Sequence, residues 1–233
     1  MNPIEEDVRR VDFGYFVRPG SETDSGSLRV EPVLGYLVRR AERWLLFDSG
    51  MGAGHEDLDA HYRPVRRPLA EALAMAGVPL DEVAWVANCH LHFDHCGGNP
   101  ELVGRPVFAQ EMELRTARER NDYTLPELVA ETIDYQAVGG ETEVLPGVHL
   151  VPTPGHVQGH QSLIVRRRDG TVICAGQSHD SASLFTYDAL AHRAHAEGVD
   201  EPLPVSPAWM ETLLRFDPAR VVFAHDLAVW EPR

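Results

Sequence analysis

The stretch NCHLHFDHCGG, residues 88–98, places three histidines and an aspartate within six positions. It follows an apolar run of strand length, and ligands carried on a loop at the end of a rigid strand are typical of functional sites. In extended backbone, His90 and His92 point to the same side. A turn after them directs Asp94 and His95 toward a neighbouring point. The stretch therefore predicts a site for one or two metal ions.

Later motifs offer further candidate ligands. Four histidines lie at predicted strand ends and loops: His156 and His160 in TPGHVQGH, His179 in GQSHD, and His225 in FAHD. A ligand set spread over several elements is typical of an open catalytic site, whereas structural zinc sites favour compact Cys and His spacing. The alternative, a polar loop that is rich in histidine by chance, is disfavoured by the tight HxHxDH spacing together with these motifs.

The composition excludes two classes of partner. Thirty-six acidic residues against 21 Lys and Arg give a net charge of −15, so a nucleic acid backbone would be repelled. No apolar run approaches the ~20 residues that span a bilayer, so membrane insertion is not expected. The N-terminal MNPIEEDVRR lacks the apolar segment of a secretion signal. We expect a cytoplasmic protein with a single domain over residues 1–233.

Several polar residues receive an ordinary structural interpretation. Cys89 and Cys96 flank the histidine cluster, and we interpret them, like Cys174, as reduced buried thiols rather than ligands. The run SHDS (178–181) cannot form a Ser-His-Asp triad, because adjacent residues do not converge as a triad requires. The remaining histidines are expected at the surface: His55, His61, His149, His192 and His195.

Strand and helix patterns alternate along the chain. Strands are expected at 30–40, 43–50, 83–89, 106–110, from 148 onward, in a hairpin over 161–176 that turns at Asp169-Gly170, and at 221–226. Helices are expected at 68–78, 111–120, near 125–135 and at 206–215. This alternation predicts an α/β or α+β fold with layered packing.

These motifs resemble a known family. HLHFDH (90–95), TPGHVQGH (153–160) and FAHD (223–226), in this order, resemble the signature of the metallo-β-lactamase fold superfamily, and LFDSG (46–50) resembles its Asp-Thr-Gly corner. The resemblance implies a four-layer αββα sandwich: two sheets face to face, helices outside, and metal ions in a cleft at one edge. The length and the terminal AHD are similar to the small hydrolases of the superfamily, such as N-acyl homoserine lactonases.

The resemblance also implies roles for individual residues. Six would bind two metals: His90, His92 and His156 the first, and Asp94, His95 and His225 the second. His160 would support the loop, and Asp48 would be a hydrogen-bond partner beneath the ligands. Zinc is the expected ion, and iron or manganese also suits a site of histidine and carboxylate. Asp94 would orient the attacking water and pass a proton to the leaving group.

The chain departs from the family pattern at Gln177. The resemblance implies an aspartate there that bridges both metals, and a neutral amide offers one oxygen without charge. The second ion should therefore bind more weakly, or the site should attract an anionic substrate group. Asp180 stands where the lactonases carry a tyrosine that helps to hold the substrate carbonyl, which argues against lactonase activity in particular. Asp180 or His179 is an alternative ligand for the position of the missing carboxylate.

The expected function is hydrolysis of an ester, lactone or thioester of a small molecule. A metal-bound water has its pKa lowered toward ~7, which makes hydroxide available as the nucleophile. Two alternatives exist on the same fold. One is an iron oxygenase or oxidoreductase with a single metal, which the neutral Gln177 would favour; the other is a binding protein without catalysis. The six intact ligand positions favour the hydrolase. The sequence predicts neither the substrate nor the oligomeric state.

Overall fold

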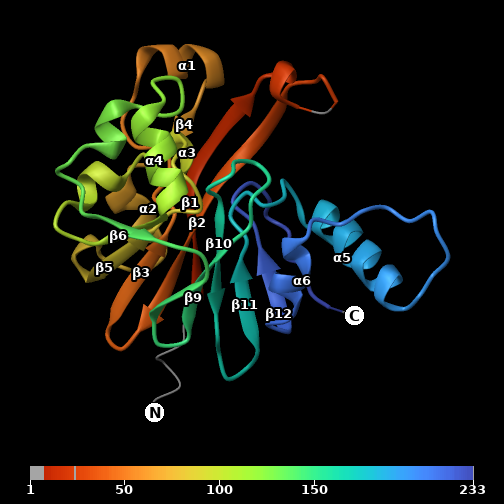
Figure 1. Cartoon of the computed structure of the whole chain (residues 1–233). Helices are drawn as coiled ribbons and strands as arrows, with labels where there is room; N and C mark the ends of the chain where they lie inside the picture. The colour runs from red at the N-terminus through yellow and green to blue at the C-terminus, as the bar shows by residue number, and fades with distance from the viewer. Residues whose placement is uncertain (1–7, 24, 233) are drawn as a thin grey trace.

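Two β-sheets form the centre of the computed structural model, which describes residues 8–23 and 25–232 (Figure 1). The strands of the first sheet are β1 (Val8–Arg18), β2 (Arg29–Arg40), β3 (Arg43–Phe47), β4 (Val65–Arg66), β5 (Val83–Ala87), β6 (Val107–Gln110) and β7 (Tyr135–Val138). Those of the second are β8 (Thr142–Leu145), β9 (Val148–Pro152), β10 (Gln161–Val165), β11 (Thr171–Cys174) and β12 (Pro218–Val222). Their orders are β4-β1-β2-β3-β5-β6-β7 and β12-β11-β10-β9-β8.

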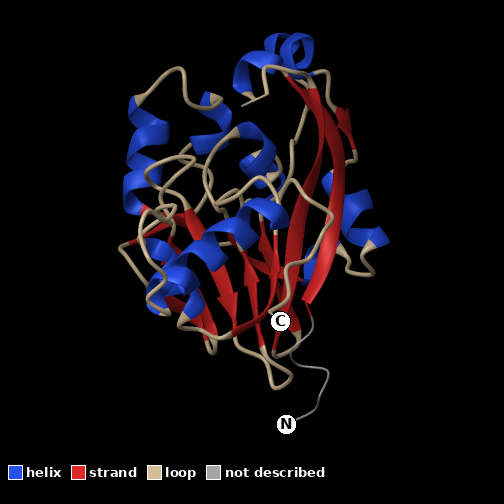
Figure 2. Cartoon of the chain, turned by 90° about the vertical axis from the view of Figure 1, so that its right-hand side faces the viewer, coloured by secondary structure: helices blue, strands red, loops and turns tan. Residues whose placement is uncertain are grey.

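Helices cover the outer faces of the two sheets. They are α1 (Glu56–Tyr62), α2 (Leu69–Met75), α3 (Phe93–Cys96), α4 (Glu111–Glu119), α5 (Ala182–Ala196) and α6 (Trp209–Leu214). The first four lie on the side of the first sheet, and α5 and α6 lie on the side of the second (Figure 1). Figure 2, turned by 90°, shows helices lying in front of the strands. Within the described residues, no helix is both long and apolar enough to cross a lipid bilayer.

Among the residues that the structure describes, three hydrophobic clusters lie between these layers. Successive residues of a strand point to opposite faces, and both faces of the central strands are apolar. Leu37 of β2 packs in the cluster that includes α2, whereas its neighbour Val38 packs in the cluster between the sheets. Leu163 of β10 joins that middle cluster, and Ile164 packs in the cluster that includes α5. The predicted four-layer αββα sandwich is confirmed.

The predicted helix near residues 125–135 is wrong. The structure has a 3-10 helix at Pro126–Val129 in this segment, followed by β7. Pro126 lacks a backbone N–H, and the residues Tyr135–Val138 pair in parallel with β6. Sheet pairing here outweighs the local helical preference. The strand β1 and the helix α5 are not among the elements predicted from the sequence.

The carboxyl ends of five strands meet at one edge of the sandwich. β3 and β5 are parallel neighbours, as are β11 and β12, and β9 runs in the same direction as β11 because each is antiparallel to β10. The backbone N–H of Gln161 donates to the carbonyl of Cys89 at 2.9 Å, which joins the two sheets at this edge. The predicted ligands follow these strands, so the topology brings them together.

Candidate metal centre

The first group of side chains at this edge consists of three imidazoles. His92 Nδ1 lies 3.0 Å from His90 Nε2 and 3.2 Å from His156 Nε2. Ligand atoms bound tetrahedrally to zinc at about 2.0–2.1 Å stand about 3.3 Å apart. His92 Nδ1 therefore lies at ligand spacing from both other nitrogens, and all three atoms lie within 4.8 Å of one another.

The second group contains a carboxylate and two imidazoles. Asp94 Oδ2 lies 3.4 Å from both His95 Nε2 and His225 Nε2, and these two nitrogens are 3.2 Å apart. All three residues are buried. The spacing again fits one tetrahedral ion. Asp94 and His95 come from α3 and His225 follows β12, so this group joins the two sheets.

Hydrogen bonds beneath the second group orient its imidazoles. His95 Nδ1 lies 3.1 Å from Asp48 Oδ2, and His225 Nδ1 donates to the carbonyl of Pro32 at 2.8 Å. Asp48 also accepts the backbone N–H of Cys89, and its own backbone is left-handed with a φ of 63°. Such partners fix the ring so that Nε2 faces the ion. Asp48 thus lies in the position expected from the sequence.

The imidazoles of the first group are neutral. Burial lowers the pKa of His90 well below its ordinary value, that of His92 to about 4, and that of His156 to about 3. A neutral imidazole has the lone pair that a metal requires. Three neutral rings whose nitrogens lie close together therefore suit a metal ion.

The second group is charged. Burial acts to raise the pKa of Asp94, but His95 and His225 outweigh it and hold that pKa well below its ordinary value. Burial acts to lower the pKa of His95. The carboxylates of Asp94 and Asp48 outweigh burial and hold that pKa well above its ordinary value. The electrostatic field at the second group therefore favours the binding of a cation.

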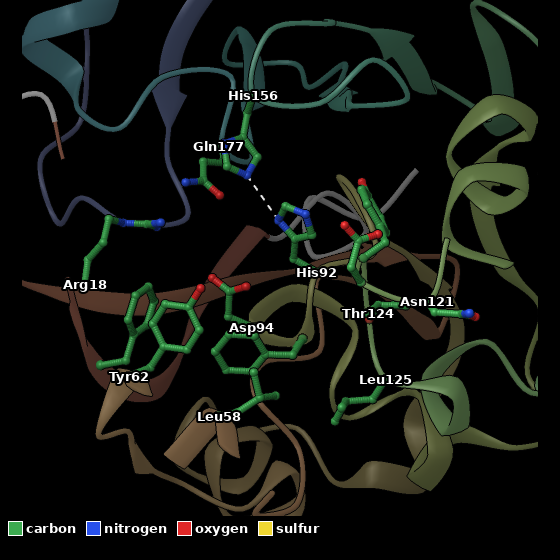
Figure 3. A pocket seen from close by; sticks show the side chains of 14 residues that line it. Arg18, Leu58, Tyr62, His92, Asp94, Asn121, Thr124, Leu125, His156 and Gln177 are labelled. Atoms are coloured by element: carbon green, nitrogen blue, oxygen red, sulfur yellow. Dashed lines mark hydrogen bonds between the residues drawn. The ribbon is translucent and has the colours of Figure 1, made fainter. Parts of the chain in front are cut away.

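Gln177 lies beside the second group. Its amide Oε1 is 3.3 Å from His95 Nε2, and its side chain points between His156 and Asp94 (Figure 3). The backbone N–H of Gln177 donates to His160 Nε2 at 3.0 Å, so His160 holds this loop from behind. The position predicted to lack a carboxylate thus presents a neutral oxygen to the site.

Asp180 and His179 lie outside both groups. Asp180 Oδ2 accepts from Arg29 at 2.6 Å, and its other oxygen lies 3.5 Å from the Gln177 amide nitrogen. His179 Nε2 is 3.0 Å from Asp188. Neither side chain occupies the position of the missing carboxylate in this structure.

Glu113 is a functional candidate that the sequence analysis does not identify. It is buried, accepts the backbone N–H of Leu91 at 2.7 Å and accepts the hydroxyl of Tyr123, whose ring lies 4.7 Å from the ring of His92. It therefore fixes the segment that carries His90 and His92. The feature of the sequence that could have identified Glu113 is an acidic residue on the buried face of a helix, next to Leu114.

The cysteines are buried and form no disulfide among the described residues. Cys89 Sγ lies 3.1 Å from His90 Nδ1 and 3.2 Å from His95 Nδ1. Burial raises its pKa to about 12, so the thiol is protonated. It packs behind the two rings, on the side away from their Nε2 atoms.

A cavity of about 310 Å³ opens over both groups (Figure 3). One wall is apolar and aromatic: Phe16, Leu58, Tyr62, Phe93 and Leu125. His92, Asp94, His156 and Gln177 form its floor, and Arg18 points into it from the end of β1. A small organic molecule can therefore reach both candidate metal positions at once.

The loop that carries His156 makes one close backbone contact. A methyl group at Gly159 would lie 2.5 Å from the backbone N and Cα of Glu113, whereas one at Gly155 meets nothing within 4 Å. We expect Gly159→Ala to lower the free energy of unfolding by about 1–3 kcal/mol, because backbone must move. Gly155→Ala, the matched control, should change it by less than about 0.5 kcal/mol. Urea unfolding measures both, and equal stabilities would contradict this packing.

The metallo-beta-lactamase superfamily model matches residues 28–225 of this chain, which therefore belongs to that superfamily. An N-acyl homoserine lactonase from Bacillus sp. is 29% identical over 217 residues, which cover 87% of this chain and 84% of the lactonase. These relatives confirm the predicted class, a metal-dependent hydrolase related to lactonases.

Solved structures share the fold. An N-acyl homoserine lactone hydrolase with the product N-hexanoyl-L-homoserine at its catalytic metal centre superimposes with a TM-score of 0.71 at 22% identity, covering 96% of this chain and 94% of that one. AidC, a dizinc quorum-quenching lactonase in complex with the same product, superimposes with a TM-score of 0.68 at 14% identity. The superposition covers 95% of this chain and 87% of AidC. At these identities the likeness supports the fold alone.

Proposed function

We propose that this protein hydrolyses the ester bond of a lactone, with an N-acyl homoserine lactone as the substrate to test, and that it uses two zinc ions. The observation that carries the proposal is the pair of three-ligand groups beneath one cavity, in which five pairs of ligand atoms lie 3.0–3.4 Å apart. The lactonase relatives support the choice of substrate. Asp180 stands where the resemblance implies a tyrosine.

The donor set fits divalent ions, with five imidazoles and one carboxylate. Bound ions would polarise the carbonyl and lower the pKa of water toward ~7. His90, His92 and His156 would hold the first ion, and Asp94, His95 and His225 the second.

Asp94 has the clearest proton-transfer role. Asp94 lies at the floor of the cavity, where its carboxylate would accept a proton from the attacking water. The water oxygen adds to the carbonyl carbon, the bond to the ring oxygen breaks, and Asp94 returns the proton to that oxygen. The product is a hydroxy acid.

The aromatic wall suits an apolar substituent of the substrate. The ring of Tyr62 lies 5.5 Å from that of Phe16 and 5.1 Å from that of Phe93, and all three line the cavity. An acyl chain packed on these rings would leave the ester bond over the floor. Apolar burial of this kind contributes about 25 cal/mol per Å².

Metal removal tests the proposal. We expect protein dialysed against a chelator to lose lactone hydrolysis, because the nucleophile requires the ions, and to regain it when zinc is added. Ring opening is followed by chromatography of the hydroxy acid, and untreated protein dialysed without chelator is the control. Lactone hydrolysis that survives complete metal removal would contradict the proposal, as would activity restored by iron and not by zinc.

Other expectations from the sequence stay predictions. These are the cytoplasmic location, the single domain over residues 1–233, the lack of a nucleic acid partner and the attraction of an anionic substrate group. Iron and manganese remain the alternative ions for the same donor set.

A further inference from the structure

Arg18 lies in the cavity and has no part in either metal group. It is the last residue of β1, and its side chain is 12% exposed. Its guanidinium points into the pocket toward Gln177 and Asp94 (Figure 3). Among the lining residues, all within the described chain, it is the sole Lys or Arg.

One buried carboxylate fixes the guanidinium. Arg18 Nε lies 2.8 and 2.9 Å from the two oxygens of Glu31, and Nη2 lies 2.8 Å from Oε2. Glu31 is 2% exposed, and the ring of Phe16 lies 5.2 Å from the guanidinium carbon. A side chain held in this way loses little entropy when it makes a further hydrogen bond.

The remaining nitrogen, Nη1, has no acceptor within hydrogen-bond distance among the residues that the structure describes. Its nearest ionic partner is Glu22 Oε2 at 3.7 Å, which is beyond hydrogen-bond distance. The hydroxyl of Tyr62 donates to Glu22, and the hydroxyl of Tyr123 donates to Glu113, so these donors of the cavity are already used. Nη1 therefore offers two N–H groups to a ligand.

The charge of Arg18 is stable in this position. Burial acts to lower its pKa, but hydrogen bonding to Glu31 and the charges of Glu31 and Asp94 outweigh burial and raise the pKa. Glu31 also accepts from Arg29, so its single negative charge is shared by two guanidiniums and Arg18 keeps part of its positive charge toward the cavity.

We propose that Arg18 Nη1 donates a hydrogen bond to the carbonyl oxygen of the substrate ester and stabilises the negative charge that develops on it. This inference rests on the function proposed above. As water adds to the carbonyl carbon, the electron pair of the C=O bond moves to this oxygen. It returns when the bond to the ring oxygen breaks, and Arg18 keeps its protons throughout. The product carboxylate would then accept the same hydrogen bond.

Arg18→Gln in the zinc-loaded protein tests this role. We expect kcat to fall about 10²–10³-fold, the usual effect of removing one donor to a developing oxyanion, with KM changed less than about threefold. Calorimetry should show weaker binding of the hydroxy acid product. Added guanidinium should restore part of the activity of Arg18→Ala. Arg10→Gln, on an exposed residue of the same strand, is the control and should match the unmodified protein.

In these variants the buried carboxylate of Glu31 loses its partner Arg18, which can destabilise the fold. The double variant Arg18→Gln/Glu31→Gln removes that buried charge as well, and it is measured beside the single variants. An unchanged kcat in Arg18→Gln would overturn the assignment to Arg18 alone. If the Arg18 variants lose zinc together with activity, and guanidinium does not rescue Arg18→Ala, the catalytic assignment is also overturned. Arg18 would then have a structural role. Absence of lactone hydrolysis in the unmodified protein would instead overturn the function proposed above.

Discussion

Asp94→Asn is expected to lower kcat/KM for lactone hydrolysis by about 10²–10⁴-fold, the range for a general acid–base group. The change removes the carboxylate of the second group, whose Oδ2 lies 3.4 Å from the nitrogens of both His95 and His225. It also removes the proton acceptor proposed for the attacking water. Both losses act in the same direction, so this substitution should have the largest effect of any that we propose.

The control for Asp94→Asn is Asp169→Asn, which changes an exposed carboxylate in the turn of the hairpin. Steady-state kinetics with a single lactone, on proteins of equal zinc content, measures both variants. If Asp94→Asn keeps more than about a tenth of the original kcat/KM, the proton-transfer role is wrong.

Gln177→Asp is expected to raise the affinity for the second ion at least about tenfold, since even indirect partners of a metal change affinity by 10–100-fold. The amide oxygen already lies 3.3 Å from His95 Nε2, so a carboxylate at this position adds a negative charge beside the second group. The number of ions that remain bound after extensive dialysis should rise toward two per chain.

Gln177→Asn is the matched control, because it shortens the side chain without adding charge. Mass spectrometry of the native protein and zinc titration measure the ion content of all three proteins. An affinity for the second ion that is the same in Gln177→Asp and Gln177→Asn would contradict the explanation by charge.

The sequence is sufficient to predict which side chains gather at this edge of the sandwich. HxHxDH follows a buried strand, and His156 and His225 follow strands whose carboxyl ends reach the same edge. The motifs and the direction of the strands therefore constrain the positions of all six side chains. Whether these side chains bind metal remains a prediction that the titrations above address.

Other parts of the site depend on contacts that are distant in the sequence. Arg18 enters the cavity because Glu31, 13 residues away on the neighbouring strand, holds it there. Glu113 is marked only as an acidic residue on a buried helix face. His179 resembles a ligand in the sequence, but its ring contacts Asp188, nine residues onward in α5, rather than either metal group. The segment predicted as a helix near 125–135 also depends on a distant contact, since Tyr135–Val138 at its end pair with β6.

Titration of zinc into metal-free protein by calorimetry, with native mass spectrometry of the product, tests the two-ion site most directly. We predict two zinc ions per chain, the second bound more weakly than the first because Gln177 brings no charge. His90→Ala should remove the first binding event and His225→Ala the second. Saturation at one ion per chain, or no binding at all, would contradict the two-ion site.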